Sequence, residues 1–348
     1  MPARYAVVLL AIALAGCIPN LSDWSLVEPG QDGGPPPGQD AGSGTPNPIE
    51  LGVPCPNPHL LVGMISGSGT TARVLRVDPT TRTACRSSPI LELQRAFGSR
   101  IADVDWHPDT GAILGLDEAV LALDAEGFPA WRHDPFGYGG VGGDWVAVFG
   151  SGASARVAVA WTDGSSSLET LRLLDARGFP TSADISLPSG RDVIAAHPDG
   201  SGRILLAPRY GVDVEVYTVG DATTALTTAS ASQLWTGAID LESGYRYHLA
   251  SDPSTQRLVI THAEGIAFWQ VDGPAPSTVI DCASYCSSFH AAAPDPNATG
   301  AAYALCSDAG SSGKRHLVHL AGTCTLVADG TSVGTHTMQD IALVRAAL

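Results

Sequence analysis

Charged side chains stand at the beginnings of several short apolar runs, where they could bind a small polar ligand or a cation. Acidic, guanidinium and imidazole groups occur together in this set, a mixture that is typical of binding sites when it surrounds one opening. In an alternative interpretation, they are strand-end charges that pair with neighbouring structural units. The residues are Asp103, Asp105, Arg191, Asp192, Arg246, His290 and Asp340.

If these carboxylates and the imidazole bind a metal, Ca²⁺ and Zn²⁺ are the candidates, because Ca²⁺ prefers oxygen ligands and Zn²⁺ also accepts nitrogen. No organic cofactor is predicted. Two short motifs resemble catalytic signatures but lack the required surroundings. Gly330-Thr-Ser332-Val-Gly334 has the spacing of a nucleophile elbow, yet a strand instead of a helix is predicted to follow it. Lys314 follows a Gly/Ser run, yet Arg315 stands where a phosphate-binding loop needs Ser or Thr.

Six cysteines beyond position 17 form an even set that suits three disulfides in an exported protein. Sequence alone leaves all pairings open, but the short spacing favours a local bridge between Cys282 and Cys286. Alternatively, Cys282, Cys286 and His290 could bind zinc, because thiolates and imidazole are zinc ligands. The six are Cys55, Cys85, Cys282, Cys286, Cys306 and Cys324.

The elements that would position these groups are short strands. From residue 55 onward, apolar or alternating runs recur between Gly, Pro, Asp and Ser clusters, a pattern that predicts an all-β protein. Residues 212–217, Val-Asp-Val-Glu-Val-Tyr, alternate strictly, as a half-buried strand does. Other predicted strands cover residues 72–77, 119–123 and 156–161.

A recurring phrase places a Pro/Asp turn between two apolar strands, as in a β-hairpin. It contains Pro108, Pro198, Pro253 and Pro296, and a related Gly/Ser turn follows residue 149. The resulting period of roughly 45 to 50 residues with four strands is that of a β-propeller blade.

We expect a single β-propeller over residues 55–348, with six blades and with seven as the alternative. The first unit lacks an inner strand, and the strand at residues 340–344 lacks a hairpin partner. Pairing these two ends would close the ring and remove both open edges. The chain resembles bacterial propellers with Pro-Asp turns, such as NHL-like and Tol-type propellers, but the shared motifs are too general to carry over any functional residue.

The first residues predict export. Arg4 precedes an uncharged apolar stretch that is too short to span a membrane, as in a secretory signal peptide. Leu14-Ala-Gly-Cys17 resembles the lipobox of bacterial lipoproteins, which implies removal of residues 1–16 and a lipid on Cys17. Ile18 stands where an aspartate would favour the inner membrane, so the outer membrane is favoured, with the protein on its periplasmic face or at the cell surface.

Residues 17–54 are rich in Pro, Gly and Asp, which predicts a disordered stalk with a mean span of roughly 30 Å. The formal charge of −16 excludes a nucleic-acid partner, which would require Lys and Arg patches. We therefore expect a membrane-anchored, non-enzymatic binding or scaffold protein of the cell envelope, whose partner is an envelope protein or polymer. The alternatives are a metal-dependent hydrolase or lyase of the propeller type, and a structural component without a discrete ligand. The sequence does not indicate an oligomeric state.

Overall fold

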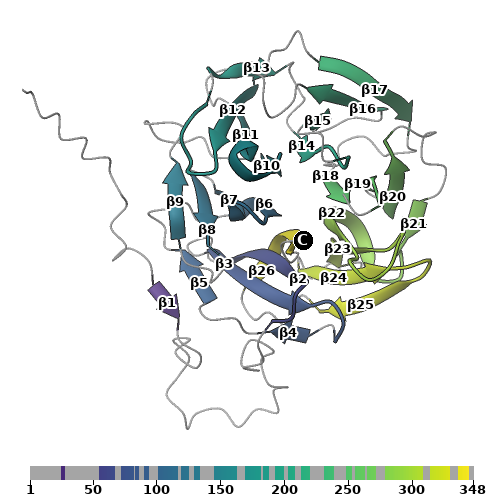
Figure 1. The fold of residues 1–348 in the computed structure, drawn as a ribbon. Coiled ribbons are helices and arrows are strands. Elements are labelled where there is room, and N and C mark those ends of the chain that lie inside the picture. Colours follow the sequence, from purple (N-terminus) through teal and green to yellow (C-terminus); the bar gives the residue numbers. More distant parts are fainter. Residues whose placement is uncertain are drawn as a thin grey trace, which may run out of the picture.

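The chain folds into a ring of β-sheets around a central axis (Figure 1). None of the described residues belongs to a helix long and apolar enough to cross a bilayer. The computed structural model describes residues 25–27, 55–66, 72–81, 83–85, 90–93, 101–116, 119–124, 129–133, 145–162, 169–181, 183–187, 193–199, 203–207, 213–219, 231–238, 248–252, 255–262, 265–271, 279–308, 314–329 and 336–344.

Five of the sheets are regular blades, each with four consecutive antiparallel strands. The first two contain β6 (Ile101–His107), β7 (Gly111–Leu116), β8 (Val120–Leu123) and β9 (Pro129–His133), then β10 (Trp145–Phe149), β11 (Arg156–Thr162), β12 (Glu169–Asp175) and β13 (Ile185–Leu187). The third contains β14 (Val193–Ala196), β15 (Ile204–Ala207), β16 (Asp213–Val219) and β17 (Ala231–Ala238). The last two contain β18 (His248–Asp252), β19 (Arg257–His262), β20 (Gly265–Gln270) and β21 (Val279–Asp281), then β22 (Cys286–Pro294), β23 (Ala302–Asp308), β24 (Arg315–Leu320) and β25 (Cys324–Ala328).

A further, six-stranded sheet joins the two ends of the described chain. Its strands are β26 (His336–Val344), β2 (His59–Ser66), β3 (Ala72–Asp78), β4 (Thr83–Cys85), β5 (Ile90–Leu93) and β1 (Ser25–Val27). The C-terminal strand β26 pairs with β2 along its length, so the predicted closure between the two ends is confirmed.

The β-propeller prediction is confirmed, but the number of regular blades is five, not six or seven. The closing sheet does not repeat the blade pattern, because its innermost strand comes from the C-terminal end and its outer part contains three short strands. One of these is β1, which lies within the predicted stalk and pairs with β5. Within the predicted stalk the structure describes residues Ser25–Val27, and these form a strand.

The predicted Pro/Asp turns are confirmed as hairpins in the described residues. In the β6–β7 turn, the N–H of Thr110 binds the carbonyl of His107 at 3.2 Å, and Nδ1 of His107 accepts the N–H of Asp109. His197 accepts the N–H of Asp199 in the same way before β15. The recurring His-Pro-Asp phrase therefore has a structural reason, since the histidine closes the turn.

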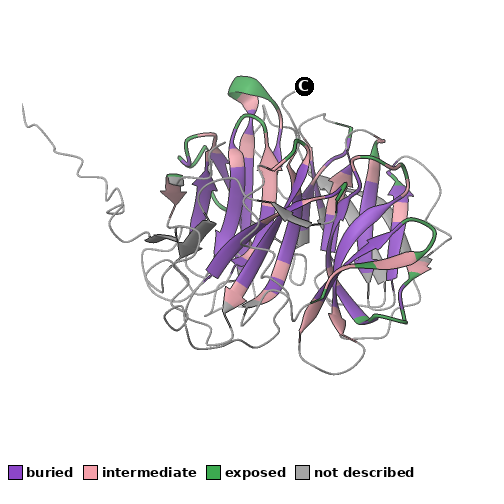
Figure 2. Ribbon diagram, turned by 90° about the horizontal axis from the view of Figure 1, so that it is seen from below, coloured by how far each residue is buried: buried purple, intermediate pink, exposed green. Residues whose placement is uncertain are grey.

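Apolar side chains fill the spaces between adjacent sheets, and Figure 2 shows the buried strands with exposed residues at the turns. Ile113 and Val120 of one blade pack in one cluster with Val146 and Val157 of the next. Because each blade buries both faces against its neighbours, the inner strands are fixed around the axis and can hold side chains at defined places there.

Two disulfides lie in and next to the last regular blade. Cys282 pairs with Cys324, and Cys286 pairs with Cys306. The predicted local bridge between Cys282 and Cys286 is therefore wrong, as is the zinc interpretation that needed both thiolates. Cys55 is also disulfide-bonded, whereas the side chain of Cys85 lies outside the described part of the structure.

Candidate functional site

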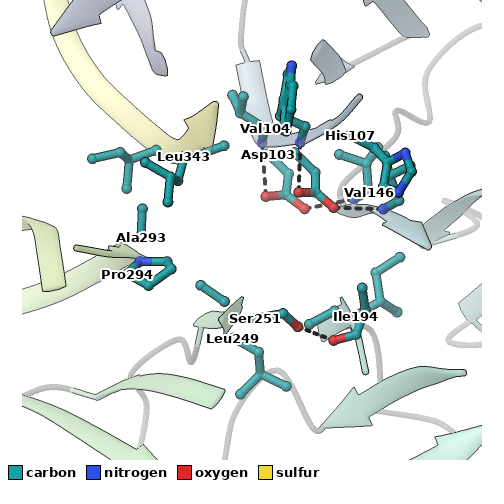
Figure 3. Close-up of a pocket in the computed structure, with 18 of the residues that line it drawn as sticks. Asp103, Val104, His107, Val146, Ile194, Leu249, Ser251, Ala293, Pro294 and Leu343 are labelled. Atoms are coloured by element: carbon teal, nitrogen blue, oxygen red, sulfur yellow. Dashed lines mark hydrogen bonds between the residues drawn. The ribbon is translucent and has the colours of Figure 1, made fainter. Parts of the chain in front are cut away.

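The inner strands surround a pocket with a volume of about 560 Å³, to which β6, β10, β14, β18, β22 and β26 all contribute. Along β6, exposure rises from Asp103, which is 3% exposed, to Pro108 and Asp109 at the surface. The mouth of the pocket therefore lies on the side of the β6–β7 turn. Figure 3 shows Asp103, Ser251 and Pro294 on different sides of the opening.

The lining is acidic on β6 and mostly apolar elsewhere. Valine, isoleucine, leucine, alanine and proline supply most of the other lining positions, and none of the described lining residues is a lysine or an arginine. The ionisable lining residues are Asp103, Asp105, His107, Asp109 and His248. Such a mixture of apolar surface with a few convergent polar groups is typical of small-ligand sites.

Carboxylates of β6 bind backbone N–H groups of β10, 43 residues further along the chain. Asp103 accepts the N–H of Val146 at 2.7 Å, and Asp105 accepts that of Val148 at 2.6 Å. Asp109 makes an equivalent bond at the turn, also at 2.6 Å. Each inner strand is the edge strand of its sheet, so the backbone N–H groups along its unpaired edge have no partner within that sheet. The carboxylates of the neighbouring blade accept these N–H groups. The alternative interpretation, pairing with neighbouring units, therefore holds for both predicted aspartates of β6.

Asp340 of β26 makes the corresponding bond to the next sheet, because it accepts the N–H of Val104 on β6 at 2.5 Å. Asp103 also accepts this N–H, at 3.0 Å, so two buried carboxylates meet at one donor. Sequence analysis singled out both aspartates, and the fold brings them together from strands far apart in the chain.

His248 of β18 completes this cluster. Its Nε2 atom lies 3.3 Å from Oδ1 of Asp340 and 3.7 Å from Oδ1 of Asp103. Its Nδ1 atom accepts the N–H of Ala292 on β22 at 3.3 Å, and its own backbone N–H donates to the hydroxyl of Thr261. The ring is thus held on both sides and links three sheets at the inner end of the pocket.

The three groups of the cluster have perturbed pKa values with identifiable causes. Burial and the charge of Asp340 raise the pKa of Asp103 well above its usual range. Burial also opposes ionisation of Asp340, but the charge and hydrogen bond of His248 outweigh it and lower the pKa of that carboxyl. Burial disfavours the charged His248 ring, yet the two carboxyls raise its pKa to about 10. The neutral form is therefore favoured at Asp103 and the charged form at Asp340.

Asp105 differs from this cluster because it stands nearer the mouth. Burial raises its pKa to about 6, against the hydrogen bonds from the N–H groups of Val148 and Trp106, which favour the charged form. At neutral pH the carboxylate is therefore mostly ionised. Within the described part of the chain, no ion pair involves Asp105.

Asp103, His248 and Asp340 are the one described group whose ligand atoms are close enough to hold a metal ion, within 4.8 Å of one another. A metal would need the lone pair of Nε2, the ring atom that faces the carboxyls. In the neutral ring, an Nδ1 atom that accepts the N–H of Ala292 leaves the proton on Nε2. The doubly protonated ring, which the raised pKa favours, carries a proton on both nitrogens and has no acceptor at Nδ1. Metal-binding histidines instead donate from their second nitrogen to an acceptor. The residues fit a hydrogen-bonded network better than a Ca²⁺ or Zn²⁺ site.

His248 was not among the residues predicted from the sequence. A signal was present, because His248 precedes the turn residue Pro253 by five positions, as Asp103 precedes Pro108. The two therefore occupy the same level on their inner strands. The residue predicted from this strand was Arg246, two positions before His248.

Of the other predicted site residues, some lie outside the described part of the structure and one lies away from this cluster. Arg191, Asp192 and Arg246 lie outside the described residues, as does the Gly330–Gly334 motif. His290 of β22 is half-buried, and its Nε2 atom lies 2.6 Å from the hydroxyl oxygen of Ser307 on the neighbouring strand. It does not line the pocket, because a register shift next to Phe289 changes the side to which β22 directs its residues.

Sequence comparison finds no matching protein-family profile and no matching curated protein. Solved structures do resemble this fold. A protein of unknown function from Bacteroides caccae matches with a TM-score of 0.55 at 12% identity, over 83% of this chain and 100% of that one. A functionally unknown protein from Desulfotomaculum acetoxidans matches with a TM-score of 0.50 at 13% identity, over 82% and 90%.

A β-propeller domain from Myceliophteria thermophila also matches, with a TM-score of 0.46 at 13% identity, over 77% of this chain and 85% of that domain. At such identities the resemblance concerns the fold alone. What this chain binds has to be argued from its own residues.

Proposed function

We propose that this protein is a lipid-anchored, non-enzymatic binding propeller of the bacterial envelope, and that its ligand occupies the channel pocket. The pocket carries the proposal. It is bounded by all the inner strands, opens at one face, and combines apolar lining with carboxylates at its inner end and on one wall. Pockets of this size and composition accommodate small organic ligands.

The non-enzymatic part of the proposal is supported by the chemistry of the described cluster. Asp103 and Asp340 bind backbone N–H groups of adjacent sheets, and the His248 ring is held between two partners. These groups are engaged in linking sheets. Among the described partners of the His248 ring, none is a serine, cysteine or threonine side chain that could act as a nucleophile. The alternative of a metal-dependent hydrolase is weakened by the proton on Nε2.

A ligand screen tests the pocket. The full chain carrying Cys17→Ser would be screened against a chemically diverse set of small molecules by thermal unfolding, because a ligand at a hundred times its Kd stabilises the folded state by about 2.7 kcal/mol. Ala250→Leu enlarges a half-buried pocket residue, and Ala321→Leu makes the same change in the exposed β24–β25 turn. We expect Ala250→Leu alone to abolish the stabilisation. A screen without any stabilising ligand, or ligands indifferent to Ala250→Leu, would overturn the proposed site.

The anchor is tested separately. Lipobox resemblance at Leu14–Cys17 and the Pro/Gly-rich segment after it support a tethered domain. Cells fed an alkyne-bearing fatty acid should incorporate it into the wild-type chain and not into Cys17→Ser, which should become extractable without detergent. Label in the Cys17→Ser chain, or an unlabelled wild type, would contradict lipidation at this residue.

A further inference from the structure

From the charges of the channel pocket we infer the class of its ligand: a small organic cation, an alkylammonium on an apolar body, whose charged group meets the carboxylate of Asp105. This inference rests on the proposed function, because it assumes that the pocket is a ligand site. Beyond the proposed function, the inference specifies that the ligand is positively charged, that Asp105 recognises its charge, and that the rest of the ligand is apolar.

The first step is the charge balance of the pocket. Burial and the charge of Asp340 oppose ionisation of Asp103, and the Asp340 carboxylate lies 3.3 Å from Nε2 of His248. Burial lowers the pKa of His107, so this ring is neutral at neutral pH. Asp105 is mostly ionised and forms no ion pair within the described residues. Among the described residues of the inner pocket, the uncompensated negative charge therefore lies on Asp105.

The second step is the geometry of Asp105. Its Oδ1 atom accepts the N–H of Trp106 at 2.7 Å and its Oδ2 atom that of Val148 at 2.6 Å. A carboxylate has about four lone-pair positions, so each oxygen retains a position for a ligand donor. Both backbone bonds hold the carboxylate in place, so a cation would meet an oriented acceptor without ordering a flexible side chain.

The third step is the lining contributed by the other inner strands. Ala196, Ala250, Ala292 and Pro294 lie on β14, β18 and β22, and Leu343 lies on β26, next to β6. These side chains offer no ligand atoms to a bare metal ion, and the hydroxyl of Ser251 already donates to the carbonyl of Ala196. An anion would meet carboxylates, and the described lining contains no lysine or arginine to offset them. A cation with an apolar body satisfies both sides of the pocket.

A matched series of probes tests the inference on the full Cys17→Ser chain. Phenethylamine is cationic at neutral pH, phenethyl alcohol is neutral and hydrocinnamate is anionic, while their bodies are similar. Calorimetric titration should show phenethylamine binding about tenfold or more tightly than the alcohol, as a charge-assisted hydrogen bond implies. An amide-capped, acetylated lysine added to the series distinguishes free amines from lysine side chains of peptides. If the lysine probe bound more tightly than phenethylamine, the ligand would be a lysine side chain of a peptide, and the inference of a small organic cation would be overturned.

Two substitutions identify the recognising carboxylate. Asp105→Asn should reduce the preference for phenethylamine over the alcohol to within about threefold, because the ion pair is lost while the apolar contacts remain. Asp199→Asn removes a carboxylate from the equivalent His-Pro-Asp turn of another blade and should keep the full preference. If Asp105→Asn does not fold, Asp105→Glu, which shifts the carboxylate by one methylene, should weaken the amine more than the alcohol.

The outcomes separate this inference from the proposed function. Preference for the neutral or anionic probe, or an amine preference that survives Asp105→Asn, would overturn the ligand class. If a neutral or anionic ligand bound to the protein and its binding were abolished by Ala250→Leu, the pocket would still be supported as the binding site. Stoichiometric metal in the purified chain that is lost with Asp105→Asn would replace the organic cation by a metal ion and overturn the inference.

Discussion

Removal of the Asp340 carboxylate should destabilise the propeller far more than removal of an exposed carboxylate that makes the same kind of bond. Asp340 is 2% exposed, accepts the N–H of Val104 at 2.5 Å and lies 3.3 Å from Nε2 of His248. In Asp340→Ala, a buried N–H loses one of its acceptors and the buried His248 ring loses its counter-charge. Breaking a buried charge pair in this way costs about 3 to 5 kcal/mol.

The matched control is Asp109→Ala, since Asp109 accepts the N–H of Gly152 at 2.6 Å but stands at the surface. There water can replace the lost acceptor, so the expected cost is about 0.5 to 1.5 kcal/mol. The free energy of unfolding would be measured by urea denaturation at neutral pH for both variants. A double-mutant cycle with His248→Ala should give a coupling energy of about 0.5 to 3 kcal/mol between Asp340 and His248.

Equal losses of stability in Asp340→Ala and Asp109→Ala would refute the reasoning, because they would show that burial of the carboxylate contributes nothing. A coupling energy of zero with His248→Ala would mean that the loss of stability in Asp340→Ala comes from the hydrogen bond to the Val104 N–H alone. The interaction between Asp340 and the His248 ring would then contribute nothing to stability.

Three further predictions concern other parts of the fold. Replacing Cys282 and Cys324 by serine should lower the free energy of unfolding by about 4 kcal/mol, the chain-entropy value for a loop of 42 residues, and reducing agent should then destabilise the variant less than the wild type. Gly178→Ala should lower the melting temperature more than Gly322→Ala: both glycines have positive φ, but only the first Cβ would meet an indole ring, at 2.5 Å. Finally, the folded-state pKa of His248, about 10, lies above the ordinary 6.5, so its stabilisation is complete below about pH 6.5 and is lost as the pH rises towards 10. Thermal unfolding between pH 7 and 10 should therefore show a steeper loss of stability in the wild type than in His248→Gln, and parallel curves would contradict the assignment.

Much of the fold was accessible from the sequence because its signals are local. Pro108 and Pro198 mark turns that are closed by hydrogen bonds between nearby residues, and the strands on either side alternate or are continuously apolar. The pairing of the ends also followed from local patterns, since one strand lacked a partner at each end. The closing sheet was harder to predict because β1, β4 and β5 are short, and their pairing depends on which edge remains available.

The cluster could be predicted only in part because it depends on positions around the ring. Asp103 and Asp340 stood out as charges next to apolar runs. His248 shares with Asp103 its spacing of five residues from a turn proline, but no such spacing places Asp340 of β26 at their level. The disulfides show the same limit. Cys282 and Cys286 are close in sequence, yet β22 begins at Cys286, whose disulfide partner lies on the adjacent strand β23, and Cys282 joins the start of β25. Which cysteines form a disulfide therefore depends on which strands lie side by side, and the distance between the cysteines in the sequence does not indicate it.

The pairing of β26 with β2 determines when the ring can form during biosynthesis. β26 is the last described strand to be synthesised, yet it supplies the innermost strand of the sheet that contains the first strand of the propeller. Until residue 344 has emerged, one edge of β2 and the Val104 N–H of β6 lack partners that the native protein gives them. A chain in which β26 has not yet been synthesised, or from which it has been removed by truncation, would thus present an open strand edge to other chains and to proteases.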